Sequence, residues 1–169
     1  IARRAARGRA LVALDVGPTG QLLEPTGTLR FEEAVDIFAQ TVRAGVQAGA
    51  DLILIETMTD LQEARAALLA AKENSSLPVI VTMTYEERGR TFLGCDPASA
   101  ALTLEGMGAD AIGVNCSLGP REMPPLVREL TRWSTLPIAI KPNAGLPDPG
   151  GAGYDITAEE FAGSMAELT

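Results

Sequence analysis

The strongest constraint on the fold is a short apolar run that recurs five times along the chain. The five runs occupy residues 10–16, 50–57, 78–85, 109–117 and 136–143. Their apolar side chains are mostly continuous and branched, with little alternation between apolar and polar positions. This pattern is typical of parallel strands that are covered on both faces. The sequence therefore predicts five buried, parallel strands.

Amphipathic segments with helical spacing separate and follow these runs. They occupy residues 31–49, 61–73, 97–108, 123–133 and 157–169. In the last segment Thr157 precedes Glu160 by three residues, which predicts a capping box at a helix start. A strand and a helix thus recur about every 30 residues, the length of a βα unit. We expect an α/β fold with a parallel sheet, consistent with part of a (β/α) barrel.

Length and composition favour one domain that covers residues 1–169. The chain has 169 residues, 46% of them hydrophobic, which is enough for a hydrophobic core. Its net charge of -8 argues against binding to nucleic acid, which requires clustered cations. The basic cluster, Arg3, Arg4, Arg7 and Arg9, is interleaved with alanine as on the exposed side of a helix end.

The same features suggest where the protein resides. No apolar run has the length needed to cross a bilayer, so no membrane partner is expected. Two cysteines far apart do not make a secreted disulfide framework, and a cytoplasmic location is therefore predicted. The chain begins at Ile1 and ends at Thr169 without a helix-stop signal, and we expect it to be a fragment.

Polar residues collect where each predicted strand ends. They are Asp15, Glu56 with Thr57, Thr84 with Tyr85, Asn115 with Cys116, and Lys141 with Asn143. In a parallel barrel these strand ends surround one mouth, where active sites of such folds are built. The pattern therefore predicts a binding pocket at that mouth.

Glu56 is the most informative of the charged residues. It ends a strongly apolar run, and burial of an unpaired carboxylate is costly, so a cation must lie beside it. A ligand ammonium group is favoured over a structural Arg or Lys. Asp15 belongs either to the pocket or to a cap of the following turn, and Lys141 is either functional or a solvated charge.

Cys116 is either a buried filler or a metal ligand. Zinc favours thiolate sulfur, but a catalytic zinc normally has three protein ligands. The chain has no histidine and only one further cysteine, Cys95, so residue counting alone favours the filler. Cys95 itself is expected to be a small apolar residue beside a helix start capped by Asp96.

Four ordered motifs resemble the homocysteine S-methyltransferase family, above all the homocysteine-binding domains of cobalamin-dependent methionine synthases. The motifs are VGPTG at 16–20, LILIETMTDLQEARAAL at 52–68, GVNCSLGP at 113–120 and KPNAGLP at 141–147. The resemblance implies a (β/α)8 TIM barrel, of which this chain would supply strands three to seven. It also implies zinc held by three cysteines. Cys116 matches one of them, and the Cys-Cys pair that holds the metal in the family is absent from this chain.

The resemblance also implies roles for single residues. Glu56 would hold the amino group of homocysteine, Asn115 and Ser117 would shape the thiol pocket, and Asn143 would lie beside the zinc. No residue is assigned to the substrate carboxylate. The implied reaction is methyl transfer to the homocysteine sulfur, giving methionine, with methylcobalamin as a possible donor and cobalamin and folate domains as possible partners.

Two other functions stay open at this stage. The chain could be a non-catalytic partial barrel that binds an amino acid. Alternatively, it could belong to an unrelated TIM-barrel enzyme that uses Asp15, Glu56 and Lys141 for acid/base or aldol chemistry. In either methyltransferase or binding form, the isolated chain is expected to be catalytically inactive and to bind zinc weakly.

Overall fold

The fold is built on a parallel five-stranded sheet, seen here in a computed structural model that describes residues 1–145, 153–154 and 156–168. The strands are β1 (Ala13–Val16), β2 (Leu52–Met58), β3 (Val79–Met83), β4 (Ala111–Asn115) and β5 (Ile138–Lys141). They pair in sequence order, each parallel to the next. The five predicted strands are confirmed, and the α/β partial barrel predicted from them is the observed fold class.

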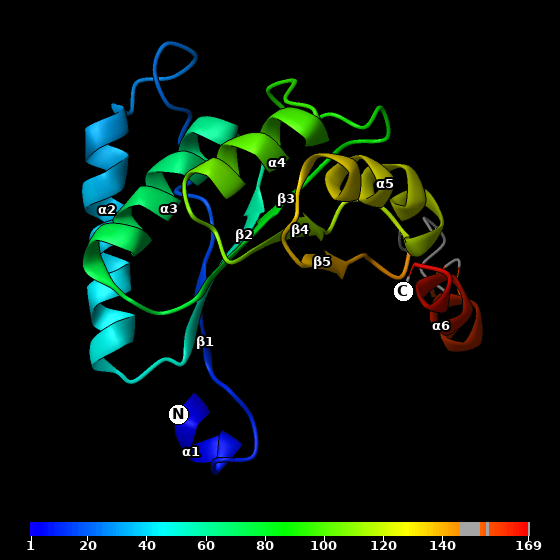
Figure 1. The fold of residues 1–169 in the computed structure, drawn as a ribbon, viewed down its shortest axis with the longest axis horizontal. Coiled ribbons are helices and arrows are strands. Elements are labelled where there is room, and N and C mark those ends of the chain that lie inside the picture. Colours follow the sequence, from blue (N-terminus) through cyan, green and yellow to red (C-terminus); the bar gives the residue numbers. More distant parts are fainter. Residues whose placement is uncertain (146–152, 155, 169) are drawn as a thin grey trace.

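Helices connect the strands and cover one face of the sheet. They are α1 (Ala2–Ala6), α2 (Phe31–Gln47), α3 (Leu61–Asn74), α4 (Pro97–Gly106), α5 (Met123–Trp133) and α6 (Ala158–Ala166), with a 3-10 turn, η1 (Pro120–Glu122). Figure 1 shows α2, α3, α4 and α5 following one another along the outer side of the curved sheet. Among the described residues, no helix combines the length and the apolar character needed to cross a bilayer.

Side chains at the helix starts explain where several helices begin. Asp60 accepts a hydrogen bond from Gln62 N at 2.9 Å at the start of α3, and Asp96 accepts one from Ser99 N at 2.8 Å at the start of α4. The predicted capping box of α6 is present, with Thr157 and Glu160 bonded reciprocally. These side chains satisfy backbone N–H groups that have no partner within their helices.

The two faces of the sheet differ in burial. The register aligns Val16, Ile55, Val81 and Ile112 on the face that the helices cover, and all four are buried. On the opposite face Leu54, Ile80 and Ala111 are aligned but only half-buried. The expected covering of both faces is therefore wrong for the open face, because α2 to α5 pack on the other one.

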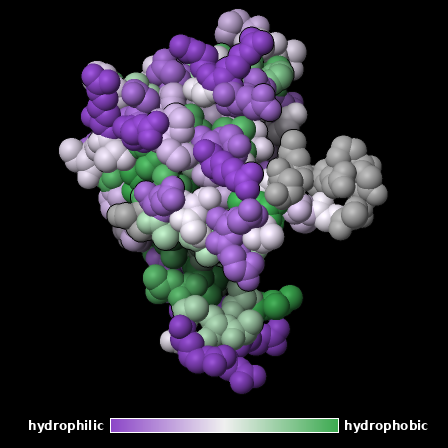
Figure 2. All heavy atoms as spheres, turned by 90° about the vertical axis from the view of Figure 1, so that its right-hand side faces the viewer, coloured by the Kyte–Doolittle hydropathy of each residue, from purple (hydrophilic) through white to green (hydrophobic). Residues whose placement is uncertain are grey.

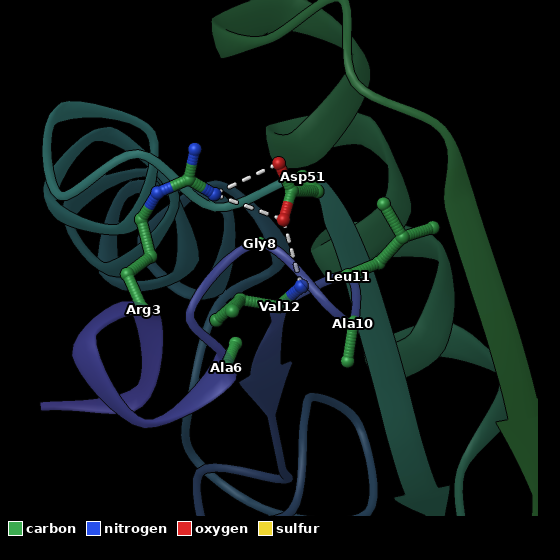
Figure 3. Close-up of a pocket in the computed structure, with 7 residues that line it drawn as sticks. All are labelled: Arg3, Ala6, Gly8, Ala10, Leu11, Val12 and Asp51. Carbon is green, nitrogen blue, oxygen red and sulfur yellow. Dashed lines mark hydrogen bonds and ion pairs between the residues drawn. The ribbon is translucent and has the colours of Figure 1, made fainter.

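The N-terminal segment is attached to the sheet through one acidic residue. Arg3 Nη1 donates to both carboxylate oxygens of Asp51, at 2.8 and 2.9 Å, and Val12 N donates to Oδ2 at 2.7 Å (Figure 3). Helix α1 has no buried residue, in agreement with the prediction of an exposed basic helix end. In Figure 2, hydrophobic side chains gather on the surface between this segment and the body of the molecule.

Candidate functional site at the carboxyl edge of the sheet

Because all five strands are parallel, their carboxyl ends lie at one edge of the sheet. Hydrogen bonds or ion pairs there join residues from β2, β3, β4 and β5. These contacts form two groups, a buried network centred on Asn115 and a more exposed ion pair between Glu56 and Lys141. Apart from Thr82, the residues of both groups are strand-end residues that the sequence singled out.

Asn115 is the centre of the buried network. Its side chain is 2% exposed. Its Oδ1 accepts hydrogen bonds from Thr57 N at 2.9 Å and from the Thr82 hydroxyl at 2.7 Å. Its Nδ2 donates to Thr57 Oγ1 at 2.8 Å and to Cys116 Sγ at 3.2 Å. The amide thus makes all four of its hydrogen bonds, and its orientation is fixed by neighbours on β2, on β3 and in the loop after β4.

Three residues at this edge adopt the left-handed backbone conformation. The φ angles are 62° at Thr57, 57° at Cys116 and 58° at Ser117. This conformation is unfavourable for side chains other than glycine, particularly for a β-branched threonine. Such backbone strain costs about 1 to 3 kcal/mol per residue and persists where surrounding contacts enforce it. Asn115 supplies such contacts to Thr57 and Cys116, so the strained turns and the network support each other.

The loop after β4 is bonded to the loop after β5. Cys116 N donates to the Lys141 carbonyl at 3.0 Å, and Asn143 N donates to the Leu118 carbonyl at 3.0 Å. Ser117, which is exposed, therefore lies in the same loop as Cys116, and Asn143 lies in the neighbouring loop that is bonded to it. The GVNCSLGP motif requires a glycine at position 113, because a Cβ there would collide with the Ala139 carbonyl of β5.

Glu56 and Lys141 form an ion pair between β2 and β5. The two strands are separated by β3 and β4, so the side chains meet only because the sheet is curved. Their side chains are 24% and 44% exposed. The cation beside Glu56 in this structure is thus a lysine of the same chain, the alternative that the sequence analysis ranked second.

Cys116 does not have the partners that a metal site requires within the described part of the chain. No group of three His, Cys, Asp or Glu side chains there could hold a metal ion. Cys95 packs against the hydrophobic core, and its Sγ contacts the Asp96 carbonyl at 3.3 Å. Burial, with a smaller contribution from the Asp96 charge, raises the pKa of Cys95 to about 11. The described residues alone therefore do not form a zinc site.

Two strand-end residues do not join the site as expected. Tyr85 is fully buried in the core, and burial raises the pKa of its hydroxyl above the ordinary range. The prediction that Tyr85 lines the mouth is therefore wrong, because its side chain packs in the hydrophobic core. Asp15 is exposed on β1 and takes no part in the hydrogen bonds and ion pairs described at this edge. Of the three residues that the acid/base alternative would use, only Glu56 and Lys141 therefore lie in contact with each other.

Two residues that support the site, Thr82 and Glu63, were not predicted from the sequence. The Thr82 hydroxyl donates to Asn115 Oδ1, and Thr84, which was predicted at the strand end, donates through its hydroxyl to the Asn115 carbonyl at 3.0 Å. Glu63 in α3 is 4% exposed and accepts hydrogen bonds at 2.6 Å from both the backbone N and the hydroxyl of Thr19. The threonines that interrupt the apolar runs were the available signal, because a buried hydroxyl requires a partner.

Comparison with known proteins settles the family. The family model described as homocysteine S-methyltransferase matches residues 1–169. The chain belongs to the homocysteine S-methyltransferase family. Methionine synthases of Mycobacterium leprae and Mycobacterium tuberculosis are each 34% identical to this family member in an alignment of 158 positions that covers 89% of the chain. The match is 13% of each synthase, so the chain spans about an eighth of their length.

Solved structures support the fold of this homocysteine S-methyltransferase family member. The homocysteine methyltransferase MmuM from Escherichia coli matches with a TM-score of 0.73 and 22% identity, covering 99% of the chain and 69% of MmuM. The carboxyl transferase domain of Rhizobium etli pyruvate carboxylase also matches, with a TM-score of 0.58 and 19% identity over 94% of the chain and 26% of that domain. Proteins of different activity share this fold, so the fold alone does not assign a reaction.

Proposed function

We propose that the chain forms the homocysteine-binding part of a methyltransferase that transfers a methyl group to homocysteine and produces methionine. The observation that carries this proposal is the pairing of Cys116 with the fixed Asn115 amide at the edge where Glu56 also lies. A carboxylate and a thiol on one side of a sheet can lie beside the ammonium group and the sulfur, respectively, of a small thiol-containing amino acid. Family membership and the similarity to methionine synthases support the same reaction.

In the proposed site, Glu56 binds the substrate ammonium group and Cys116 lies toward the substrate sulfur. The Asn115 Nδ2 group donates to Cys116 Sγ, which disperses negative charge on that sulfur and restricts its rotation. Ser117 and Asn143 belong to the loops on either side and would shape the thiol end of the pocket. The strained turns at Thr57 and Cys116 keep these groups in place before substrate binds.

Cys116 is proposed to be one of three thiolate ligands of a zinc ion, with the other two supplied from outside this chain. A zinc in that position would stabilise the thiolate form of homocysteine, which is a stronger nucleophile than the thiol. Methylcobalamin is the proposed methyl donor, with S-methylmethionine or a betaine as the alternatives. Cobalamin and folate domains are proposed as neighbours in a longer polypeptide, because the matched synthases are about eight times longer than the aligned segment.

Metal analysis and ligand binding test this proposal. The purified chain is expected to carry well under one zinc per molecule, because it supplies one ligand. In a longer form that contains the remaining barrel, Cys116→Ser should abolish zinc retention, whereas Cys95→Ser should leave it unchanged. Stoichiometric zinc in the 169-residue chain, or full zinc content after Cys116→Ser in the longer form, would contradict the proposal.

A further inference from the structure

The Glu56–Lys141 ion pair bears directly on how the proposed amino group of the substrate is recognised. Lys141, the last residue of β5, is bonded to the loop that holds Cys116, since its carbonyl accepts the hydrogen bond from Cys116 N. Its ammonium group pairs with the carboxylate that the proposed function assigns to the substrate ammonium. An incoming amino acid therefore meets a carboxylate that already has a cation of the same chemical type.

We infer that Lys141 competes with the substrate ammonium group for Glu56 and thereby sets the affinity and selectivity of the site. This inference rests on the proposed function. Lys141 Nζ has to leave Glu56 before a ligand ammonium can take its place. The lysine can do so because its side chain is 44% exposed and has four flexible methylenes that allow the ammonium to turn toward water.

The magnitude of the competition follows from the exposure of the pair. Partly exposed ion pairs contribute modest stability, because water and salt screen them. A ligand of about millimolar or tighter affinity can therefore displace Lys141 from Glu56. The displacement reduces the affinity of that ligand for the site. A thiol without an ammonium group gains nothing from Glu56 and leaves the ion pair intact, so the competition acts only on ligands that carry a cation. The same carboxylate then accepts a ligand cation only when that cation is better placed than the lysine.

Binding of L-homocysteine to the 169-residue chain and its variants tests the inference, measured by calorimetry or by NMR titration. Lys141→Met removes the competing cation and keeps a side chain of similar length. It should tighten L-homocysteine binding about two- to tenfold. Lys141→Arg keeps a competing cation and should bind within about twofold of the wild type. Binding of 4-mercaptobutyrate, which lacks the ammonium group, should not improve in Lys141→Met.

Lys72→Met is the matched control for the loss of one positive charge. Lys72 pairs with Asp110 at 3.5 Å, outside the network at the carboxyl edge, and its side chain is 38% exposed, close to the 44% of Lys141. It should leave the affinity for L-homocysteine unchanged. Thermal unfolding of each variant establishes that the fold is retained.

The outcomes separate this inference from the proposed function. Wild-type binding of L-homocysteine with equal or weaker binding by Lys141→Met would overturn the inference alone, and weaker binding would make Lys141 a contributor to the substrate site. Binding that appears only in Lys141→Met supports the inference. A failure of both the wild type and Lys141→Met to bind L-homocysteine would overturn the proposed ammonium site, and the inference with it.

Discussion

The side-chain amide of Asn115 donates a hydrogen bond to Cys116 Sγ at 3.2 Å, and the two residues are neighbours in the chain. Adjacent residues of an extended strand point to opposite faces, so this contact requires the chain to turn sharply at Cys116. The φ angle of 57° at Cys116 provides that turn. The end of β4 therefore positions the Asn115 amide, and the turn at Cys116 brings Sγ within hydrogen-bonding distance of that amide.

The Asn115 network should contribute strongly to stability. Asn115→Ala removes both acceptor and donor partners and leaves the buried Thr82 hydroxyl and the part-buried Thr57 N without this partner, so we expect a loss of about 2 to 4 kcal/mol. Thr82→Val removes only one donor and should cost about 1 kcal/mol. Urea unfolding measures both. Thr28→Val, at an exposed loop position, is the control, and an Asn115→Ala effect no larger than that of the control would refute the network's role.

Cys95 should react slowly with iodoacetamide in the folded protein. In Cys116→Ser only Cys95 remains, and burial raises its pKa from about 9 to about 11. Because the thiolate is the reacting form, alkylation of the folded protein should be slow at pH 8 and should rise toward pH 11. Urea-unfolded Cys116→Ser is the control and should titrate near pH 9. A folded-state profile with the same midpoint would contradict the burial of Cys95.

The same pKa shift predicts a pH dependence of stability. Cys95 binds its proton more tightly in the folded protein than in the unfolded chain, so its contribution is fully present below about pH 9. Between about pH 9 and pH 11 the unfolded chain loses the proton first, and the free energy of unfolding should fall. Comparison of Cys116→Ser with the double variant Cys95→Ala, Cys116→Ser isolates this contribution. An identical pH dependence of both proteins in this range would exclude it.

The outline of the fold could be predicted from the sequence because burial leaves a local signature. Each apolar run became a strand, and the helix starts at Asp96 and Thr157 follow from capping rules that act over three residues. The strand ends could likewise be assigned to one edge, because parallel strands put their carboxyl ends together. These features depend on short-range order in the chain.

The contacts within the site could not be predicted in the same way. The Glu56–Lys141 pair spans two intervening strands, and only the curvature of the sheet brings the side chains together. The bonding of Asn115 to Thr57 depends on a left-handed backbone at Thr57, a conformation that no propensity of threonine suggests. Tyr85 was misassigned because its place at the strand end does not distinguish it from Thr84, whose hydroxyl bonds to the Asn115 carbonyl, whereas Tyr85 is buried in the hydrophobic core.

Glu63 should hold the loop after β1 against helix α3. Its carboxylate is buried and accepts two hydrogen bonds from Thr19 at 2.6 Å. Glu63→Ala leaves the Thr19 N–H without this partner, and we expect a loss of about 1 to 3 kcal/mol with faster hydrogen exchange at that amide. Glu73→Ala, at an exposed position of the same helix, should change stability by no more than about 0.5 kcal/mol. Equal effects of the two substitutions would show that Glu63 does not anchor the loop.

Asp51 should hold the N-terminal segment through its contacts with Arg3 and Val12 (Figure 3). The Arg3 guanidinium, and next the Val12 N–H, lower the pKa of Asp51 below 3.8. The attachment is therefore fully present above the ordinary pKa and is lost as the pH falls through the lowered one.

Hydrogen exchange at the Val12 amide should be faster in Arg3→Met than in the wild type, and high salt should reduce the difference because the pair is exposed. Arg4→Met is the matched control from the same helix, and its exchange at Val12 should equal that of the wild type. Unchanged exchange in Arg3→Met at low salt would mean that the Val12 bond to Asp51 does not depend on the arginine.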